Sequence, residues 1–202
     1  MKSPIGTTRR FGEDGGMELF ILPAGPVDAE AVAHVQRKSW AATYAQQLSP
    51  MSLARAEAAW DAPHWRHSLE RVDGRSFTLV LANQRGIAGF GTAGRRRGRP
   101  DPLVGKYDSE IYMLYLLPRF QGQGHGGRLM TALASALKAR GSRSALVWAL
   151  ASNRPAIGFY EHLGGAVLTD RKQPFFGDTV TETALGWPDI DILAAMPRDA
   201  RK

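Results

Sequence analysis

The spacing of apolar residues along the chain alternates between two patterns. Apolar side chains three or four residues apart lie on one side of an α-helix, whereas short runs of β-branched and aromatic residues bounded by Gly, Pro, Asn or Asp are typical of strands. The predicted helices are Val27–Tyr44, a segment from Ser49 that stops or bends near Pro63 and can resume through Leu69, a segment that follows Gly124 and ends at Gly141, and a segment from Asn153 to Gly164. The predicted strands are Glu18–Leu22, Ser76–Ala82, Ile87–Thr92, Glu110–Leu117, Ala145–Leu150, Ala166–Arg171 and Thr179–Leu185.

The order of these elements predicts the class of fold. Strands and helices alternate, and the run Glu110–Leu117 is apolar at nearly every position, which places it in the centre of a sheet covered on both faces. An α/β fold with a mixed, partly antiparallel sheet follows. We expect one domain over residues 17–187, preceded by a flexible Gly-rich extension over residues 1–16 and followed by a tail over residues 188–202 that can dock as a short helix.

Composition narrows the chemistry that such a domain can perform. The 202 residues include no Cys, which removes thiol nucleophiles, Fe–S clusters, zinc ribbons and disulfides. No apolar run approaches the roughly 20 residues that span a bilayer, and the first residues lack the apolar stretch of a signal peptide, so we expect a cytoplasmic protein without a membrane partner. The formal net charge of +7 suggests an anionic partner. Composition alone leaves three alternatives open: nucleic acid, a phosphorylated cofactor, or no anionic partner at all.

A glycine-rich stretch, Gln121–Gly127, lies between the central strand and the following helix. Its glycines let the backbone approach a ligand closely, and the free N–H groups of the first helical turn favour an anion, so the stretch predicts a phosphate or pyrophosphate cradle. The alternative is a glycine-softened turn without a ligand. Gly122, Gly124 and Gly127 also match G-x-G-x-x-G, but that dinucleotide motif needs an acidic residue about 20 residues on. None occurs between Gly127 and Glu161, and the Gly-Lys-Ser/Thr of a Walker loop is missing as well.

Two motifs resemble those of the GNAT superfamily of acyl-CoA-dependent N-acetyltransferases. The superfamily's loop, Gln/Arg-x-x-Gly-x-Gly/Ala, is matched by Gln121, Gly124 and Gly126. Its second signature is an Asn that opens a helix, a Tyr seven residues later and then Leu-Gly, and it is matched by the stretch Asn153–Gly164. With the matching order of strands and helices, the resemblance extends from Glu18 to Leu185. It implies the GNAT fold, a mixed and mostly antiparallel sheet of six to seven strands with flanking helices, splayed at a central parallel pair.

The resemblance also implies a set of residues that bind acetyl-CoA. Backbone groups of Leu114, Tyr115 and Leu116 are expected to hold the pantetheine arm in the gap between the two parallel strands, with the Leu116 N–H polarising the thioester carbonyl. Asn153 is expected to contact the cofactor through its side-chain amide, and the alternative is a plain helix cap. The residues expected to hold the pyrophosphate are Gln121, Gly122, Gln123, Gly124, His125, Gly126 and Gly127.

Two residues are candidates for proton transfer. Tyr160 stands where the superfamily has a general acid for the departing sulfur, and its alternative is a core aromatic on the apolar stripe of its helix. Glu110 matches a strand position at which some members have a catalytic Glu, since an amine with a pKa near 10.4 needs a base at neutral pH. The alternatives for Glu110 are a surface charge or a partner for nearby arginines, with a water chain as the base. Trp148 stands where members that acetylate protein N-termini have a Glu, which argues against that activity.

Several other residues have two interpretations. Arg95, Arg96, Arg97 and Arg99 form a solvated loop or a site for an acidic substrate, and they lack the interleaved aromatic residues that nucleic acid would favour. His64 and His67 have no third ligand, so no metal site is expected. Aromatic residues of the first helices and the last hairpin are core residues by default and candidates for the wall of an acceptor pocket. They are Trp40, Tyr44, Trp60, Trp65, Phe175 and Phe176.

These observations together predict an acetyl-CoA-dependent N-acetyltransferase. It would transfer the acetyl group to a small-molecule or peptide amine by direct attack in a ternary complex, since no Cys and no Ser in a nucleophile elbow is present to form an acyl-enzyme. The alternative is a non-catalytic acyl-CoA-binding or basic nucleic-acid-binding module on the same scaffold. The acceptor amine and the formation of a homodimer stay open.

Overall fold

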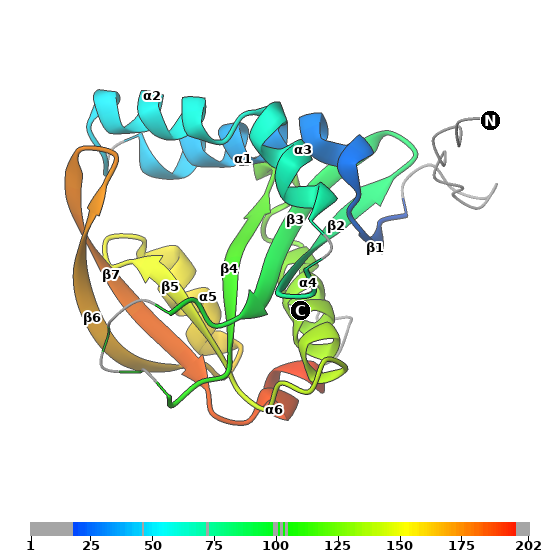
Figure 1. Ribbon diagram of the computed structural model, residues 1–202, viewed down its shortest axis with the longest axis vertical. Helices are drawn as coiled ribbons and strands as arrows, with labels where there is room; N and C mark the ends of the chain where they lie inside the picture. Colours follow the sequence, from blue (N-terminus) through cyan, green and yellow to red (C-terminus); the bar gives the residue numbers. More distant parts are fainter. Residues whose placement is uncertain are drawn as a thin grey trace.

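The computed structural model describes residues 18–45, 47–71, 73–98, 101, 103 and 105–196. Its seven strands form one sheet in the order β1-β2-β3-β4-β5-β7-β6, with helices on both faces (Figure 1). Strands β4 and β5 are parallel, and the other neighbouring pairs are antiparallel. The predicted α/β class and mixed sheet are confirmed. The strands are β1 (Phe20–Pro23), β2 (Ser76–Asn83), β3 (Gly86–Arg95), β4 (Ser109–Leu116), β5 (Ala145–Leu150), β6 (Ala166–Phe175) and β7 (Asp178–Trp187).

The helices follow the predicted segments. Of the stop or bend predicted near Pro63, the structure has the stop, slightly earlier in the chain, at Trp60 and Asp61, and a separate helix follows it. Asp61 begins the next helix because its carboxylate accepts a hydrogen bond from the His64 N–H at 2.9 Å, and Pro63 lies in the first turn, where a missing N–H costs nothing. The helices are α1 (Ala29–Tyr44), α2 (Pro50–Ala59), α3 (Ala62–Glu70), α4 (His125–Lys138), α5 (Arg154–His162) and α6 (Ile190–Ala194), with 3₁₀ turns η1 (Pro26–Asp28) and η2 (Pro118–Phe120).

Of the predicted N-terminal extension and C-terminal tail, the structure describes only part of the tail. The expected extension over residues 1–16, and residues 197–202 of the expected tail, lie outside the described residues. The described part of the tail docks as the short helix α6, with Ile190 and Leu193 buried. The last hairpin is longer than predicted, because β6 and β7 continue to a two-residue turn at Phe176 and Gly177, which have φ angles of 49° and 112°.

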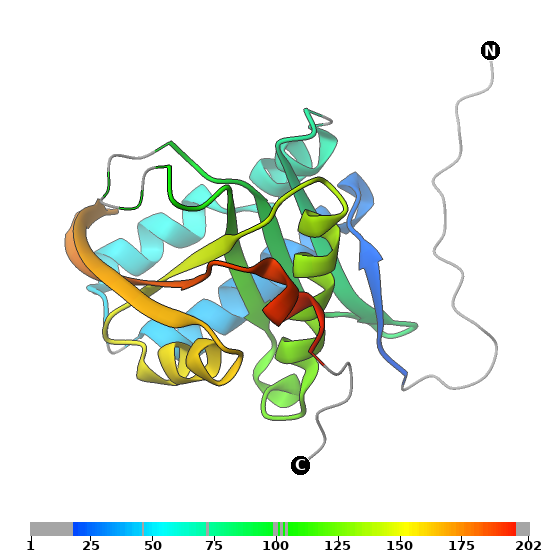
Figure 2. The ribbon, with the colours of Figure 1, turned by 90° about the horizontal axis from the view of Figure 1, so that it is seen from below.

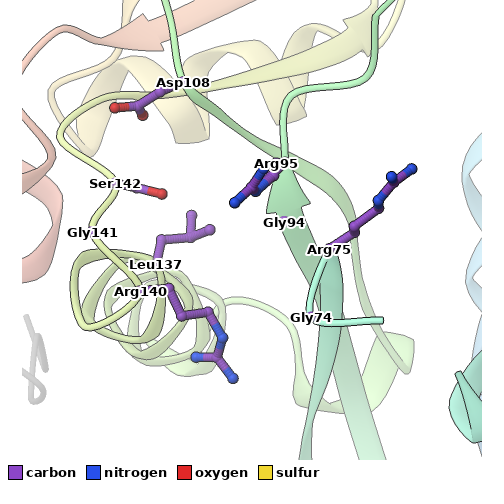
Figure 3. A pocket seen from close by; sticks show the side chains of 9 residues that line it. All are labelled: Gly74, Arg75, Gly94, Arg95, Asp108, Leu137, Arg140, Gly141 and Ser142. Atoms are coloured by element: carbon purple, nitrogen blue, oxygen red, sulfur yellow. The ribbon is translucent and has the colours of Figure 1, made fainter. Parts of the chain in front are cut away.

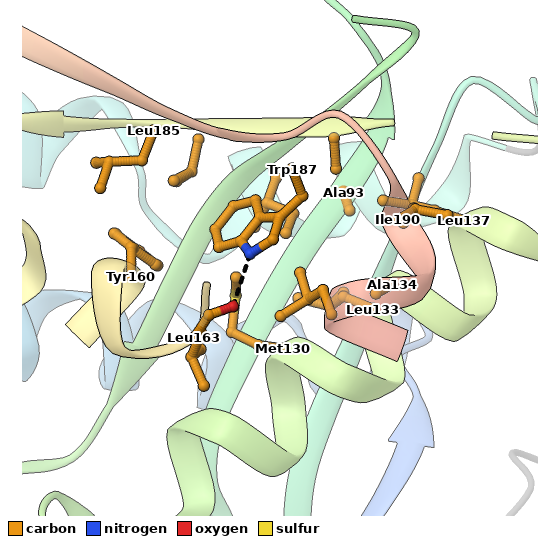
Figure 4. Packing of buried hydrophobic residues seen from close by; sticks show 14 of the residues in the cluster. Ala93, Met130, Leu133, Ala134, Leu137, Tyr160, Leu163, Leu185, Trp187 and Ile190 are labelled. Carbon is orange, nitrogen blue, oxygen red and sulfur yellow. Dashed lines mark hydrogen bonds between the residues drawn. The ribbon is translucent and has the colours of Figure 1, made fainter. Parts of the chain in front are cut away.

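Helices cover the two faces of the sheet and fix the position of its central strands. Figure 2 shows α6 beside α4, on the side of the sheet away from α1. The larger core lies there around Trp187, which is fully buried and donates from Nε1 to Leu163 O at 2.7 Å (Figure 4). On the other face, Val32 of α1 and Trp65 of α3 pack against β2 and β3. Strand β4 is therefore held between two packed layers.

Candidate active site

The parallel strands β4 and β5 diverge in the middle of the sheet (Figure 1). They pair at residues 109–111 and 145–147, and the later residues of the two strands are not paired with each other. This divergence confirms the predicted splay at the central parallel pair. Because an unpaired strand edge presents N–H and C=O groups, the gap can accept an extended ligand as an additional strand.

Hydrogen bonds to β3 decide which backbone groups of β4 face this gap. Leu117 donates its N–H to Ala88 O at 2.9 Å, in register with the β3–β4 pairing. In an antiparallel pair, successive residues direct their backbone groups alternately toward the partner strand and away from it. The backbone groups of Leu114 and Leu116 therefore face the gap, and those of Tyr115 face β3.

Two side chains hold the end of β4. The buried Ser39 Oγ of α1 donates to Leu116 O at 2.8 Å, and Gln121 Nε2 donates to the same oxygen at 3.0 Å. These bonds occupy the Leu116 carbonyl and fix the direction of its N–H. The side chain of Gln121 thus acts within the protein, and so does that of Gln123, whose Nε2 donates to Arg119 O at 2.8 Å. Sequence reasoning missed Ser39, because a lone Ser inside a helix has no pattern.

A β-bulge interrupts β4 next to the gap. Ala93 of β3 lies opposite Ile111, and Thr92 lies opposite Met113, so Tyr112 is an extra residue on β4. A bulge re-aims the side chains that follow it. Tyr112 and Met113, although adjacent, both line the same cavity. The Tyr112 hydroxyl donates to Arg95 O, which fixes the ring, and burial raises the pKa of this phenol to about 12.

The glycine-rich loop between β4 and α4 has the form of an anion cradle. Gly122 and Gly124 have φ angles of 69° and 78°, in the left-handed region that favours glycine. The first helical hydrogen bond of α4 runs from the Arg128 N–H to Gly124 O at 3.1 Å. No backbone N–H of residues 122–127 donates to a backbone carbonyl of the described chain. Unpaired N–H groups at the positive end of a 14-residue helix fit a pyrophosphate.

Two residues of the first turn of α4 show how closely this loop packs. A Cβ on Gly126 would lie 3.2 Å from the Phe159 ring, so the glycine permits close approach of α4 and α5. His125 Nδ1 is buried and has no hydrogen-bond partner among the described residues. Burial lowers the pKa of His125, and the positive charge of Arg128 adds to the shift.

Tyr160 lies on α5 with its ring in the main core. The side chain is 7% exposed, and its ring meets the Trp187 ring edge-on with centroids 6.3 Å apart. Burial raises the pKa of the phenol above its usual value, and Tyr44 adds to the shift. The hydroxyl makes no hydrogen bond to another described residue. The ring therefore takes the core position of the alternative interpretation, while the hydroxyl stays protonated and free to donate.

Asn153 caps α5, as the alternative interpretation of this residue predicts. Its Oδ1 accepts a hydrogen bond from the Ala156 N–H at 3.2 Å, and its Nδ2 donates to the Tyr44 hydroxyl at 3.4 Å. The Asn thus links the start of α5 to the end of α1.

Glu110 is engaged in an ion pair with Arg97. Its Oε1 accepts from Arg97 Nε at 2.9 Å and from Nη2, and its Oε2 accepts from the Arg97 backbone N–H at 3.2 Å. The Glu110 side chain is 4% exposed, whereas that of Arg97 is 41% exposed and lies 4.5 Å from the centroid of the Tyr112 ring. This arrangement matches the alternative in which Glu110 is a partner for the nearby arginines.

Two arginines of the arginine-rich loop, Arg96 and Arg97, form ion pairs. The almost fully buried side chains of Arg96 and Asp101 pair with each other. Arg171 Nη1 of β6 lies 3.7 Å from Asp101 Oδ2, and its Nε and Nη2 donate to Glu182 Oε2 of β7 at 2.9 and 2.8 Å. The interpretation as a solvated charge is therefore wrong for Arg96, whereas Arg97 is partly exposed and also paired. Arg99 lies outside the described residues.

A cavity of about 360 Å³ opens on the α1 side of the gap. Its wall comes from the end of α1, the residue after α2, strands β4 to β7 and the turn between β6 and β7. Trp65 lies elsewhere, against Phe90, with its Nε1 donating to Gln36 Oε1 at 2.7 Å. The predicted aromatic residues that do line the cavity are Trp40, Tyr44, Trp60, Phe175 and Phe176. Lining residues that sequence reasoning did not connect with an acceptor pocket include Tyr112, Trp148, Arg171 and Glu182.

A second cavity of about 350 Å³ lies at the opposite end of α4 (Figure 3). Arg75, Arg95 and Arg140 border it, and the Asp108 carboxylate accepts from the Arg143 N–H at 2.9 Å beside it. The 14 residues of α4 put this cavity about 21 Å from the glycine-rich loop. None of its lining residues is shared with the cavity beside the gap between β4 and β5.

Two features are absent from the described residues. No helix there combines the length and the apolar character that crossing a membrane requires. No group of three or more His, Asp or Glu side chains there is placed to hold a metal ion.

Comparison with known proteins agrees with this geometry. Residues 37–165 match the model of the acetyltransferase (GNAT) family. The chain is 29% identical over 175 residues to the uncharacterized N-acetyltransferase YuaI of Bacillus subtilis, covering 84% of this chain and 92% of that protein.

Solved structures share the fold. The PaiA N-acetyltransferase of Thermoplasma acidophilum, in complex with coenzyme A, superposes with a TM-score of 0.66 at 18% identity over 83% of this chain and 98% of that one. YncA of Salmonella typhimurium, with acetyl-CoA, gives a TM-score of 0.63 at 18% identity over 86% and 95%. Because the family match spans more than half of the sequence, the chain belongs to the acetyltransferase (GNAT) family.

Proposed function

We propose that the protein transfers the acetyl group of acetyl-CoA to a primary amine by direct attack in a ternary complex. The observation that carries this proposal is the run of backbone N–H groups over residues 122–127, without described acceptors, at the end of a strand that borders an open gap. A pyrophosphate at the loop and an extended arm in the gap would use both sets of unpaired groups.

The cofactor-binding groups in this proposal are mostly backbone atoms. The pantetheine arm pairs with the backbone of Leu114 and with the N–H of Leu116, because the Leu116 carbonyl already accepts from Ser39 and Gln121. The backbone of Tyr115 is left to β3. The pyrophosphate is bound by N–H groups of the stretch from Gly122 to Gly127, for which the side chains of Gln121 and Gln123 brace the loop. Asn153 acts by holding the start of α5, the helix that carries Tyr160.

Acetyl-CoA supplies an activated acyl group, and the protein positions and polarises it. The Leu116 N–H, aimed into the gap, donates to the carbonyl oxygen on which negative charge develops. The amine nitrogen forms a bond to the carbonyl carbon while the carbon–sulfur bond breaks. Tyr160 donates its phenolic proton to the departing sulfur and is reprotonated from solvent, and its raised pKa ensures that the proton is present throughout the physiological range.

In this proposal the base that accepts the proton of the acceptor amine is not Glu110. Both oxygens of Glu110 accept hydrogen bonds from Arg97, so neither is directed to a substrate. In this proposal Glu110 is a structural residue, and the proton leaves through water or through a carboxylate in the acceptor cavity.

The test of this function is calorimetry with CoA together with a thiol-release assay over a panel of primary amines. We expect CoA to bind and at least one amine to accelerate thiol release. Binding of CoA without turnover of any amine would favour the non-catalytic acyl-CoA-binding module. Absence of CoA binding would defeat both, and the ion-paired arginines already argue against a basic nucleic-acid-binding surface at this loop.

A further inference from the structure

The wall of the acceptor cavity is dominated by aromatic rings. Half of its lining residues are aromatic. Trp40 and Phe175 are stacked with centroids 5.5 Å apart, Trp40 meets Trp60 at 5.0 Å, and Trp60 meets Phe176 at 5.3 Å. These rings come from α1, from the residue after α2 and from the β6–β7 hairpin, and they support one another. Such a wall favours a flat apolar body, which can stack on it or meet it edge-on.

Glu182 is the acidic residue among the described residues that line this cavity. Its Oε2 accepts both hydrogen bonds from Arg171, at 2.9 and 2.8 Å. Its Oε1 accepts no hydrogen bond from the described part of the chain. This is the reverse of Glu110, whose two oxygens are both occupied. One lone carboxylate oxygen therefore remains on the cavity wall for the acceptor.

The charges on the wall limit how many ammonium groups the cavity can take. Two cations, Arg97 and Arg171, line it beside the single carboxylate of Glu182. Each arginine is itself paired with a carboxylate, so the wall has no negative excess. In a substrate with several ammonium groups, at least one ammonium would have no carboxylate to pair with and would lie near a positively charged arginine, which is unfavourable.

We propose that the acceptor is an amine with a single amino group on an aromatic body, that the ring packs on the Trp40–Trp60–Phe175–Phe176 wall, and that Glu182 Oε1 receives the ammonium group. This inference rests on the proposed acetyl transfer. Glu182 takes one proton from R–NH₃⁺, the resulting R–NH₂ forms the new bond to carbon, and its second proton goes to solvent as the amide forms. The hairpin that carries Glu182, Phe175 and Phe176 lies beyond residues 37–165, so the family match does not assign this role.

The first experiment compares amines in the thiol-release assay at fixed acetyl-CoA. Phenethylamine and tryptamine are expected to give a kcat/KM at least tenfold above those of spermidine and ethylamine. A kcat/KM for spermidine or ethylamine equal to or above that of the aromatic amines would overturn the inference while supporting the acetyl transfer itself.

Binding provides a readout that does not need turnover. Trp40, Trp60 and Trp148 line the cavity, so an aromatic amine that enters it should change tryptophan fluorescence in a saturable way in the CoA-bound protein. We expect saturation with phenethylamine and none with spermidine at equal concentration. If CoA binds by calorimetry but phenethylamine shows no saturable binding, the acceptor inference fails and the cofactor site stands.

The role of Glu182 is tested with an uncharged ligand and a matched pair of variants. Phenethylamine should bind at least tenfold more tightly than 2-phenylethanol, which has the same ring and no ammonium group. Glu182→Gln should abolish that difference in affinity and lower kcat/KM for phenethylamine at least tenfold. The control is Asp170→Asn on the same hairpin. The Asp170 carboxylate accepts a hydrogen bond from Thr183 Oγ1 at 2.7 Å, and Asp170 does not line the cavity. This variant should leave kcat/KM within twofold.

Equal affinity of the native protein for phenethylamine and 2-phenylethanol would overturn the role of Glu182 without any variant. The same conclusion follows if Glu182→Gln, with CoA affinity and Tm close to those of the native protein, acetylates phenethylamine at the native rate.

Discussion

The ion pair between Glu110 and Arg97 makes an asymmetric prediction about stability. Removing the charge of Glu110 leaves Arg97, whose side chain is 41% exposed, to be hydrated. Removing Arg97 leaves Glu110, 4% exposed, as a buried carboxylate held only by the backbone N–H of residue 97 at 3.2 Å. An unpaired buried charge is far more costly than a hydrated one, so Arg97→Gln should destabilise the protein more than Glu110→Gln.

The two costs can be estimated from this exposure. Breaking a fully buried pair typically costs about 3–5 kcal/mol and an exposed pair about 1 kcal/mol or less, so we expect about 1–2 kcal/mol for Glu110→Gln and about 3 kcal/mol for Arg97→Gln. For a chain of this length, each kcal/mol lowers Tm by about 2–4 °C. The expected decreases are therefore about 2–8 °C and about 6–12 °C.

Thermal unfolding monitored by circular dichroism measures these shifts, and the pH dependence of kcat separates stability from catalysis. If Glu110 is structural, Glu110→Gln keeps kcat within about threefold and preserves the shape of the pH–rate profile. The reasoning is refuted if Glu110→Gln retains the native Tm yet loses about a hundredfold in kcat together with the acidic limb of the profile. It is also refuted if Arg97→Gln is the less destabilised of the two variants.

Three other predictions follow from the site. Tyr160→Phe should lower turnover at least tenfold, about 1.4 kcal/mol in the barrier, with CoA affinity by calorimetry little changed, and native-like turnover would remove its role as acid. Ser39→Ala removes the buried hydrogen bond to Leu116 O. Stability should fall by about 1 kcal/mol, which lowers Tm by about 2–4 °C, and the KM for acetyl-CoA should rise. An unchanged KM would show that the end of β4 does not need this hydrogen bond. Because the folded-state pKa of Tyr112 is raised from 10.0 to about 12, its contribution to stability is fully present below pH 10 and is lost as pH rises toward 12, so urea midpoints should decline over that interval and decline less in Tyr112→Phe.

Local motifs allowed much of the fold and the cofactor side of the site to be predicted. The glycines of the loop, the cap at Asn153 and the apolar run of β4 are set by neighbours in the sequence, so their conformations could be inferred from spacing. Pro63 indicates the interruption a few residues late, because the capping Asp61, and not the proline, determines where α3 begins.

The acceptor side could not be predicted in the same way, because its chemistry depends on contacts between distant segments. Glu110 meets Arg97 across two strands, and Glu182 meets Arg171 across a hairpin. Nothing in the spacing of these residues says which carboxylate has both oxygens occupied and which retains one for a substrate. Two of the loop arginines, Arg96 and Arg97, are counterions whose carboxylates lie 5 and 13 residues away in the sequence.

The row of ion pairs formed by Arg96, Asp101, Arg171 and Glu182 has a consequence for protein engineering. The loop supplies the first two residues and the last hairpin supplies the other two. Grafting the hairpin alone onto a relative to change its substrate would separate Arg171 from Asp101, the contact that joins the two halves of the row. Loop and hairpin therefore form one transferable unit, and a successful graft must carry both.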